Sequence, residues 1–146
     1  VVARDLKRDV LHLPGSGAAG GFGGGSVAFF NSTLRMGIDI VLDITQFDRL
    51  AADADLVLTG EGKLDGQSLR GKVVVGVARR ARQLGVPVAA LVGASETDVN
   101  AVYDEGVSGV FPINPMPQPF EAVREHAEEN LRFTVSNLIR YTERLR

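Results

Sequence analysis

Residues 55–92 constrain the fold more than any other part of the chain. The apolar run Asp55–Thr59 is followed by a charged, glycine-containing segment and then by an amphipathic helical pattern over Gly66–Leu84. Gly85 is placed to end that helix, and Val86–Val92 is a continuous apolar run, as in a parallel strand buried on both faces. The order strand, helix, strand therefore predicts a parallel sheet with right-handed connections.

The remaining elements extend this α/β pattern. We expect a helix over Val27–Leu34, a strand over Val107–Ile113 and a long amphipathic helix over Phe120–Arg146 that carries His126 on its surface. Ile38–Ile44 fits either a strand or a helix. The predicted fold class is a Rossmann- or flavodoxin-like parallel sheet, with helices on both faces and a long amphipathic helix at the end.

The overall charge and composition argue against several classes of partner. A net charge of -2 leaves no basic excess for nucleic acid. The absence of cysteine excludes disulfides and thiolate metal sites and fits a reducing cytosol, so we expect a cytoplasmic protein. No apolar run reaches the roughly 18 residues of a membrane span, so we expect no membrane partner.

Two segments before residue 50 have competing interpretations. Gly15–Gly20 matches the dinucleotide fingerprint G-x-G-x-x-G, but only Val10–Leu13 and then Pro14 precede it, which leaves little room for a first strand. Close helix packing or a hinge is the favoured interpretation. Asp39 and Asp43 share a face in either conformation. They could bind Mg²⁺, but a solvated surface edge is the favoured interpretation.

Thr59–Lys72 is the candidate site. We expect it to be a loop and a helix start at the carboxyl end of a strand, where open α/β sheets bind ligands. Glu61 and Asp65 could bind Mg²⁺ or take a proton from a substrate hydroxyl, and the helix N-terminus near Ser68 favours an anion. Asp65, Ser68 and Lys72 are expected on one face. The alternative is structural, with Asp65 as an N-cap and Lys72 solvated.

The segment Gly66–Val73 nearly matches the Walker A pattern. Val73, however, stands where that pattern requires a Mg²⁺-binding serine or threonine, and the segment lies within the expected helix. We therefore do not interpret it as a P-loop.

Several motifs together resemble one known family. Leu56–Lys72, with the sequence LVLTGEGKLDGQSLRGK, is followed by Val77–Arg82 and by Gly85–Val88. These residues strongly resemble the bacterial glycerate kinases that do not use a P-loop, and Leu13–Gly21 and Gly37–Asp43 resemble the preceding segments of that family. The resemblance spans nearly the whole chain.

The resemblance implies a fragment of a two-domain α/β kinase more than twice this length. Residues 1–146 would be one α/β domain or domain fragment from its C-terminal portion, and residues 1–50 could contribute to an interdomain hinge. The implied reaction is phosphorylation of D-glycerate by ATP with Mg²⁺ in a cleft between the domains. The implied partners of the chain are D-glycerate, ATP and the missing N-terminal part of the same protein. The resemblance leaves open whether the protein forms a homo-oligomer.

Carried over to this sequence, the family motifs assign candidate roles. The residues implied in catalysis are Asp65, Glu61 and Lys72, the implied metal ligands are Asp65 and Glu61, and the implied substrate- or nucleotide-binding residues are Thr59, Gly60, Gly62, Gln67, Ser68 and Gly71. We expect the isolated chain to fold but to be catalytically silent. The alternative is a regulatory α/β module that binds a small anion without catalysis.

Overall fold

The computed structural model describes residues 1–66, 68–70, 72–96, 100–116 and 119–145. The chain divides into two compact units, Val1–Ile40 and Val41–Arg146. Helices α1 (Val2–Leu6) and α2 (Ala18–Phe30) lie in the first unit, and α3 (Gly37–Ile44) crosses the boundary. No described helix is both long enough and apolar enough to cross a membrane.

The glycine-rich segment of the first unit allows close packing of the backbone. The helix α2 is kinked at Ala19, Gly20 and Gly21, whose φ angles are all positive. A Cβ atom at Gly23 would lie 2.4 Å from the carbonyl oxygen of Gly15, which fits the packing interpretation of these glycines. Residues 1–56 are all described and contain no strand, so the first strand of a dinucleotide-binding unit is missing.

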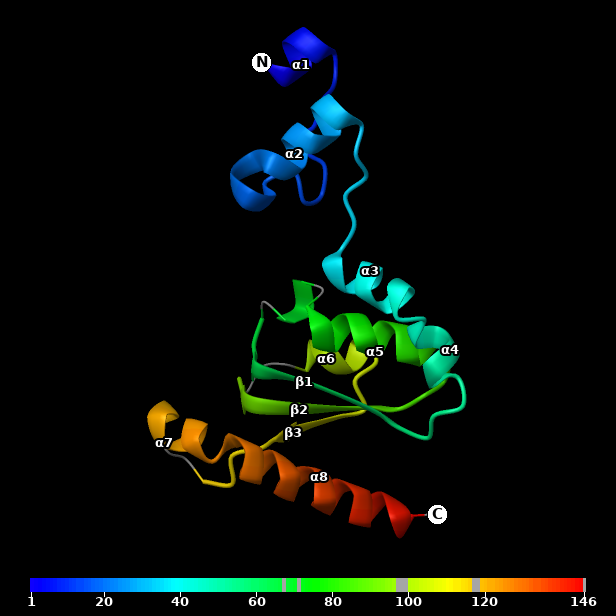
Figure 1. Ribbon diagram of the computed structural model, residues 1–146, viewed down its shortest axis with the longest axis vertical. Coiled ribbons are helices and arrows are strands. Elements are labelled where there is room, and N and C mark those ends of the chain that lie inside the picture. The colour runs from blue at the N-terminus through cyan, green and yellow to red at the C-terminus, as the bar shows by residue number, and fades with distance from the viewer. Residues whose placement is uncertain (67, 71, 97–99, 117–118, 146) are drawn as a thin grey trace. The chain divides into compact units, whose positions relative to one another are not determined.

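The second unit is an α/β structure. Its elements are α4 (Phe47–Ala51), β1 (Val57–Leu64), the 3₁₀ turn η1 (Ser68–Arg70), α5 (Val73–Gln83), β2 (Val88–Ser95), α6 (Ala101–Asp104), β3 (Gly109–Pro112), α7 (Phe120–Glu125) and α8 (Ala127–Glu143). The strands form a parallel sheet in the order β1-β2-β3. Helices α5 and α6 lie on one side of it and α8 on the other (Figure 1). The predicted fold class is confirmed.

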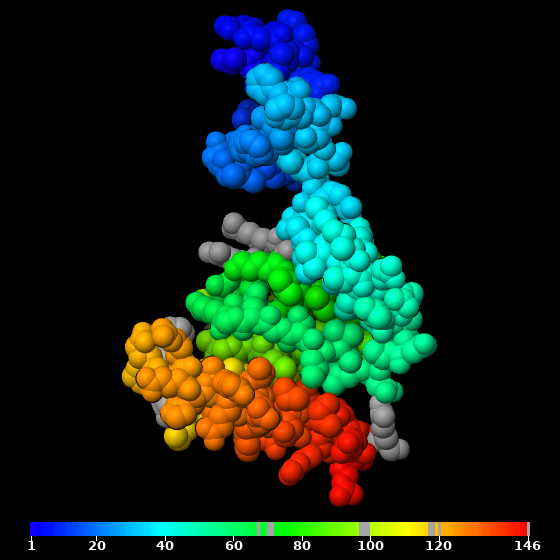
Figure 2. Space-filling view, in the orientation of Figure 1, coloured from blue at the N-terminus to red at the C-terminus, as the bar shows by residue number. Residues whose placement is uncertain are grey.

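The hydrophobic core lies between α5 and the central strand β2. Val88, Ala90 and Val92 of β2 are buried against Val74 and Ala78 of α5. Gly85, at a φ of 73°, follows the end of α5 as expected. On the other side of the sheet, α7 and α8 run along the body of the unit (Figure 2).

Several expected boundaries are wrong. The strand β1 continues to Leu64 rather than ending near Thr59, because its pairing with β2 persists through Lys63 and Leu64. The helix α5 begins at Val73 rather than at Gly66, and Val73 itself is 50% exposed instead of lying on the buried stripe.

The other elements also depart from their expected bounds. The helix expected at Val27–Leu34 ends at Phe30, where Asn31 adopts a left-handed conformation, and Ile38–Ile44 forms part of the helix α3. The long C-terminal helix is interrupted at His126, whose φ of -104° separates α7 from α8. His126 is exposed as predicted and lies 3.7 Å from Glu129.

Candidate functional site

The strand β1 presents two different faces near its carboxyl end. Side chains alternate along a strand, and paired residues of neighbouring strands share a face. Thr59 pairs with Ala90 and Glu61 pairs with Val92, both of which belong to the core beneath α5. The Glu61 carboxylate therefore lies on the α5 face of the sheet, toward the turn that follows β1.

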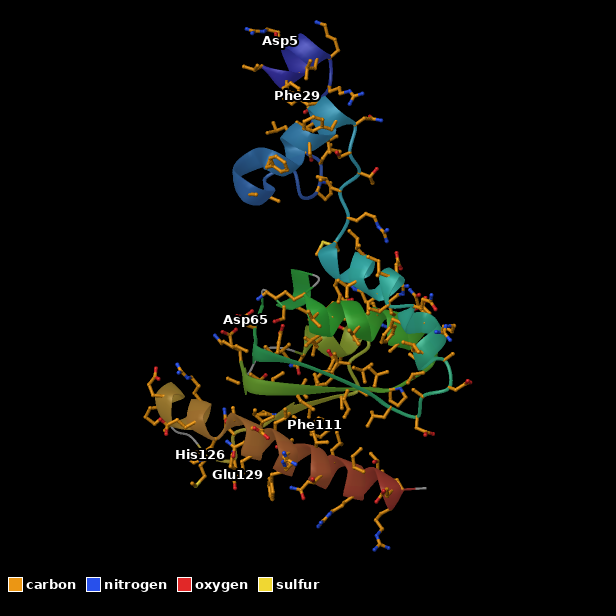
Figure 3. The ribbon with its side chains drawn as sticks, in the orientation of Figure 1. Asp5, Phe29, Asp65, Phe111, His126 and Glu129 are labelled. Carbon is orange, nitrogen blue, oxygen red and sulfur yellow. The ribbon has the colours of Figure 1, made fainter. Side chains whose placement is uncertain are left out.

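Ser68 holds the Glu61 carboxylate. The Ser68 hydroxyl donates a hydrogen bond to Oε1 of Glu61 and accepts one from the backbone N–H of Asp65 at 3.3 Å. The Ser68 side chain is completely buried, and it is the only buried polar or charged side chain among the described residues. This contact fixes the carboxylate of β1 to the turn η1, close to Asp65 at the end of the strand (Figure 3).

The segment between β1 and α5 is a turn rather than the expected helix start. The backbone N–H of Ser68 bonds to Asp65 at 2.9 Å, and that of Lys72 bonds to the Ser68 carbonyl at 3.4 Å. Lys72 has an extended backbone and an exposed side chain immediately before α5. The expectation of a shared helical face for Asp65, Ser68 and Lys72 is therefore wrong. The candidate residues Gln67 and Gly71 lie outside the described residues.

A groove of about 960 Å³ lies on the other face of the sheet. Its lining residues come from β1, β2, the segment after β3, α7 and α8, and they are Leu58, Thr59, Gly60, Glu61, Gly62, Lys63, Leu91, Gly93, Ala94, Ile113, Asn114, Val123, Arg124, Ala127 and Leu131. The lining is mainly apolar, and three of its strand positions are glycines. The candidate residues Thr59, Gly60, Glu61 and Gly62 therefore border this groove.

Polar residues at the groove were missed by the sequence reasoning. Asn114 donates a hydrogen bond to the Gly93 carbonyl at 2.6 Å and accepts one from Asn130 at 3.3 Å. Lys63 forms an ion pair with Glu96 at 2.7 Å, and this hydrogen bond raises the pKa of Lys63. Lys63 was not singled out because the strand was expected to end near Thr59, four residues earlier. Asn114 lies in a proline-rich stretch with no comparable signal.

Asp43, one of the two acidic residues of α3, has an ion-pair partner within the second unit. Arg80 of α5 bonds to Asp43 of α3 and to Asp48 of α4, each at 2.8 Å, and these hydrogen bonds raise the pKa of Arg80. Asp43 therefore joins α3 to α5 through an ion pair, which neither earlier interpretation of Asp39 and Asp43 included.

Comparison with known proteins identifies the family. The model of the glycerate kinase family matches residues 1–143. The chain belongs to the glycerate kinase family. It is 44% identical over 138 residues to a glycerate kinase from Bacillus cereus, covering 94% of this chain and 36% of that protein. It is 40% identical over 113 residues to a glycerate 2-kinase from Escherichia coli, covering 77% of this chain and 30% of that protein.

A solved structure of the same family supports this assignment. The crystal structure of a putative glycerate kinase 2 from Salmonella typhimurium LT2 matches with a TM-score of 0.71 and 40% identity, over 97% of this chain and 36% of that one. The chain therefore spans about a third of the length of these relatives.

Glu61 and Asp65 are the carboxylates at the end of β1 that could hold a Mg²⁺ ion. No group of three or more His, Cys, Asp or Glu side chains capable of holding a metal occurs in the part of the chain that the structure describes. Mg²⁺ is usually held by one or two carboxylates together with waters and substrate phosphates. Glu61, held by Ser68, and Asp65, four residues later, are carboxylates of the required kind.

Proposed function

We propose that this chain forms one wall of the active site of a longer glycerate kinase, which transfers the γ-phosphoryl group of ATP to D-glycerate. Family membership supports the reaction class. The observation that carries the assignment of the site is the Glu61 carboxylate, held by the buried Ser68 hydroxyl near the carboxyl end of β1. Open α/β sheets bind ligands at this end of their strands.

In the proposed reaction, the protein mainly positions groups and stabilises charge. The Glu61 carboxylate orients a glycerate hydroxyl and accepts its proton, while the hydroxyl oxygen bonds to the γ-phosphorus and the bond to the ADP oxygen breaks. Asp65 would be the second carboxylate ligand of Mg²⁺, and the ion would neutralise charge on the phosphates when bound. In this proposal Lys72, the residue before α5, attracts an anion together with the N-terminus of that helix.

The other candidate residues have supporting roles in this proposal. Gly62 lies beside the ligand, Thr59 and Gly60 form the strand backbone that leads to Glu61, and the buried Ser68 hydroxyl acts as a positioning group for Glu61. Gln67 and Gly71 remain candidates for binding substrate or nucleotide. The Escherichia coli relative is named a glycerate 2-kinase, and we propose the same 2-hydroxyl as the acceptor.

The proposal can be tested in a chimeric protein, hereafter the chimera. In the chimera, this chain replaces the matching segment of the Bacillus cereus relative. We expect the chimera to release ADP in the presence of D-glycerate, ATP and Mg²⁺, and ³¹P spectroscopy would identify 2-phosphoglycerate. The isolated chain should show no turnover. Robust turnover by the isolated chain would contradict the assignment of this segment to one wall of the site.

The role of Glu61 has a matched control on the surface. Glu61→Gln keeps the size of the side chain but removes its charge, and we expect kcat of the chimera to fall by roughly 10²- to 10⁴-fold. Glu129→Gln removes a carboxylate that is 84% exposed, and it should leave kcat unchanged. Normal turnover of Glu61→Gln would remove Glu61 from the mechanism. Glycerate binding without turnover by the unsubstituted chimera would favour the anion-binding module instead.

A further inference from the structure

The strand β1 lies at the edge of the described sheet. The backbone N–H of Val57 donates to Pro87, the residue before β2, at 2.9 Å. In a parallel ladder, the N–H and C=O groups of one residue point to the same neighbour, and successive residues alternate. The backbone groups of Thr59 and Glu61 therefore face β2. Those of Leu58 and Gly60 point away from β2, toward a side where no described strand lies.

The outer side of β1 is also open to solvent. Leu58, Gly60 and Gly62 are exposed, whereas Thr59 and Glu61 between them are half-buried. The apolar groove continues from this edge to α7 and α8, where Val123 and Leu131 line the opposite wall. Leu58 and Leu131, on opposite sides of the groove, are each 41% exposed.

This edge lacks the features that normally prevent pairing with another strand. Native proteins protect long edge strands with proline, bulges, outward charges or a covering segment. The strand β1 has eight residues and no proline, and its pairing with β2 is continuous from Val57 to Glu61, the stretch that contains Leu58 and Gly60. Its charged side chains are engaged within the chain, Glu61 by Ser68 and Lys63 by Glu96. The remaining protection is a covering segment.

We propose that a β-strand from the part of the polypeptide outside these residues pairs with the outer edge of β1 and fills the groove. The length of that part supports this occupant, because nearly two thirds of the Bacillus cereus relative lies outside the match. The added strand pairs with the backbone of Leu58 and Gly60 and directs alternate apolar side chains toward Leu131. This inference rests on the proposal that the chain belongs to a longer kinase.

The placement of the added strand is compatible with the proposed active site. Pairing at Leu58 and Gly60 uses the amino-terminal half of β1 and leaves the end from Gly62 to Asp65 for the ligand. Like β2 and β3, the added strand would run parallel to β1, so the segment that follows it would begin beside this end of the sheet. The second wall of the cleft would thus be supplied by the outside part of the polypeptide.

Hydrogen exchange of single backbone amides tests the pairing without substrate. In the isolated chain, we expect fast exchange at Leu58 and Gly60 and slow exchange at Thr59 and Glu61, which serve as internal controls. In the chimera, all four amides should exchange slowly. Fast exchange at Leu58 and Gly60 in the chimera would overturn the inference. Because neither ATP nor glycerate is present, an inactive chimera with slow amides would refute only the proposed reaction.

Two other patterns of protection would also overturn the inference. Protection of these amides that rises with the concentration of the isolated chain would indicate a second copy at the edge. Protection that appears only after ATP is added would indicate a small-molecule ligand in the groove.

A substitution in the groove provides a second measurement. Leu58→Lys should leave the unfolding midpoint of the isolated chain unchanged, because the Leu58 side chain is already exposed there. The same substitution should lower the unfolding midpoint of the chimera, because the added strand would cover the lysine. Tyr103→Lys changes a side chain of similar exposure, 47%, on α6 and should leave both midpoints unchanged. Equal shifts for Leu58→Lys in the two proteins would contradict a covered edge.

Discussion

Gly60→Ala tests whether β1 continues as a strand through the candidate site. A Cβ atom at Gly60 would lie 2.4 Å from the backbone carbonyl oxygen of Leu91, whereas real Cβ contacts are essentially never below 3.0 Å. The two strands must therefore separate by about 0.6 Å at this point. Overpacking of this kind costs about 1–3 kcal/mol, and weakening one ladder hydrogen bond costs about 0.5–1.5 kcal/mol more.

The reduced backbone entropy of alanine partly offsets this cost, by roughly 0.5–1 kcal/mol. We therefore expect Gly60→Ala to lower the free energy of unfolding by about 0.5–4 kcal/mol. Gly62→Ala is the matched control on the same strand, because no atom lies within 4 Å of its Cβ position. This second substitution should be neutral or stabilising by up to about 1 kcal/mol.

Urea unfolding of the isolated chain, followed by circular dichroism, measures both substitutions. The midpoint of Gly60→Ala should fall at an unchanged m value, whereas that of Gly62→Ala should not fall. Equal effects of the two substitutions would refute the reasoning, because a loop at residues 59–72 would treat both glycines alike. That result would also remove the strand edge on which the proposed pairing depends.

Two further predictions concern polar contacts, and both are measured by urea unfolding. Ser68→Ala removes the buried hydroxyl that bonds to Glu61, so we expect the free energy of unfolding to fall by about 1.5–3 kcal/mol. The control Ser136→Ala changes an exposed side chain and should be neutral. Equal effects of the two substitutions would contradict this prediction. Arg79 donates hydrogen bonds of 2.5 and 2.9 Å to the Glu105 carboxylate, and these lower the pKa of Glu105. The pair therefore stabilises the fold fully at a pH above the pKa of Glu105 in the unfolded chain, which is near 4.5. This stabilisation is lost as the pH falls through the lower pKa of Glu105 in the folded chain. Glu105→Gln should therefore cost about 0.2–1 kcal/mol at neutral pH and nothing in acid, and a pH-independent difference would contradict it.

The central part of the fold could be predicted because its burial is visible in the sequence. The strand β2 is buried on both faces, which appears as the continuous apolar run Val86–Val92. The end of α5 was predicted because Gly85 adopts a left-handed conformation that glycine favours. Local chemistry determines both features, so no knowledge of distant residues was needed.

The boundaries around the site could not be predicted because distant contacts determine them. The strand β1 contains glycines and charges that suggest a loop, yet its pairing with β2 extends the strand to Leu64. Ser68 was expected at a helix N-terminus, whereas its contact with Glu61 holds it in a turn. The groove depends on where α7 and α8 pack against the sheet, and the sequence pattern of these helices contains no information about that position.

The alternation of β1 couples the proposed chemistry to the proposed strand pairing. Glu61 directs its carboxylate toward Ser68 on the α5 face, while its neighbour Gly60 directs its backbone groups toward the open edge. A strand that pairs at Gly60 would therefore restrain the same backbone that carries the Glu61 carboxylate. Rate enhancement by positioning depends on such restraint, since small displacements of a catalytic group reduce turnover strongly. The isolated chain would then lack both the second wall of the cleft and the restraint on Glu61, which is a physical reason to expect no turnover from it.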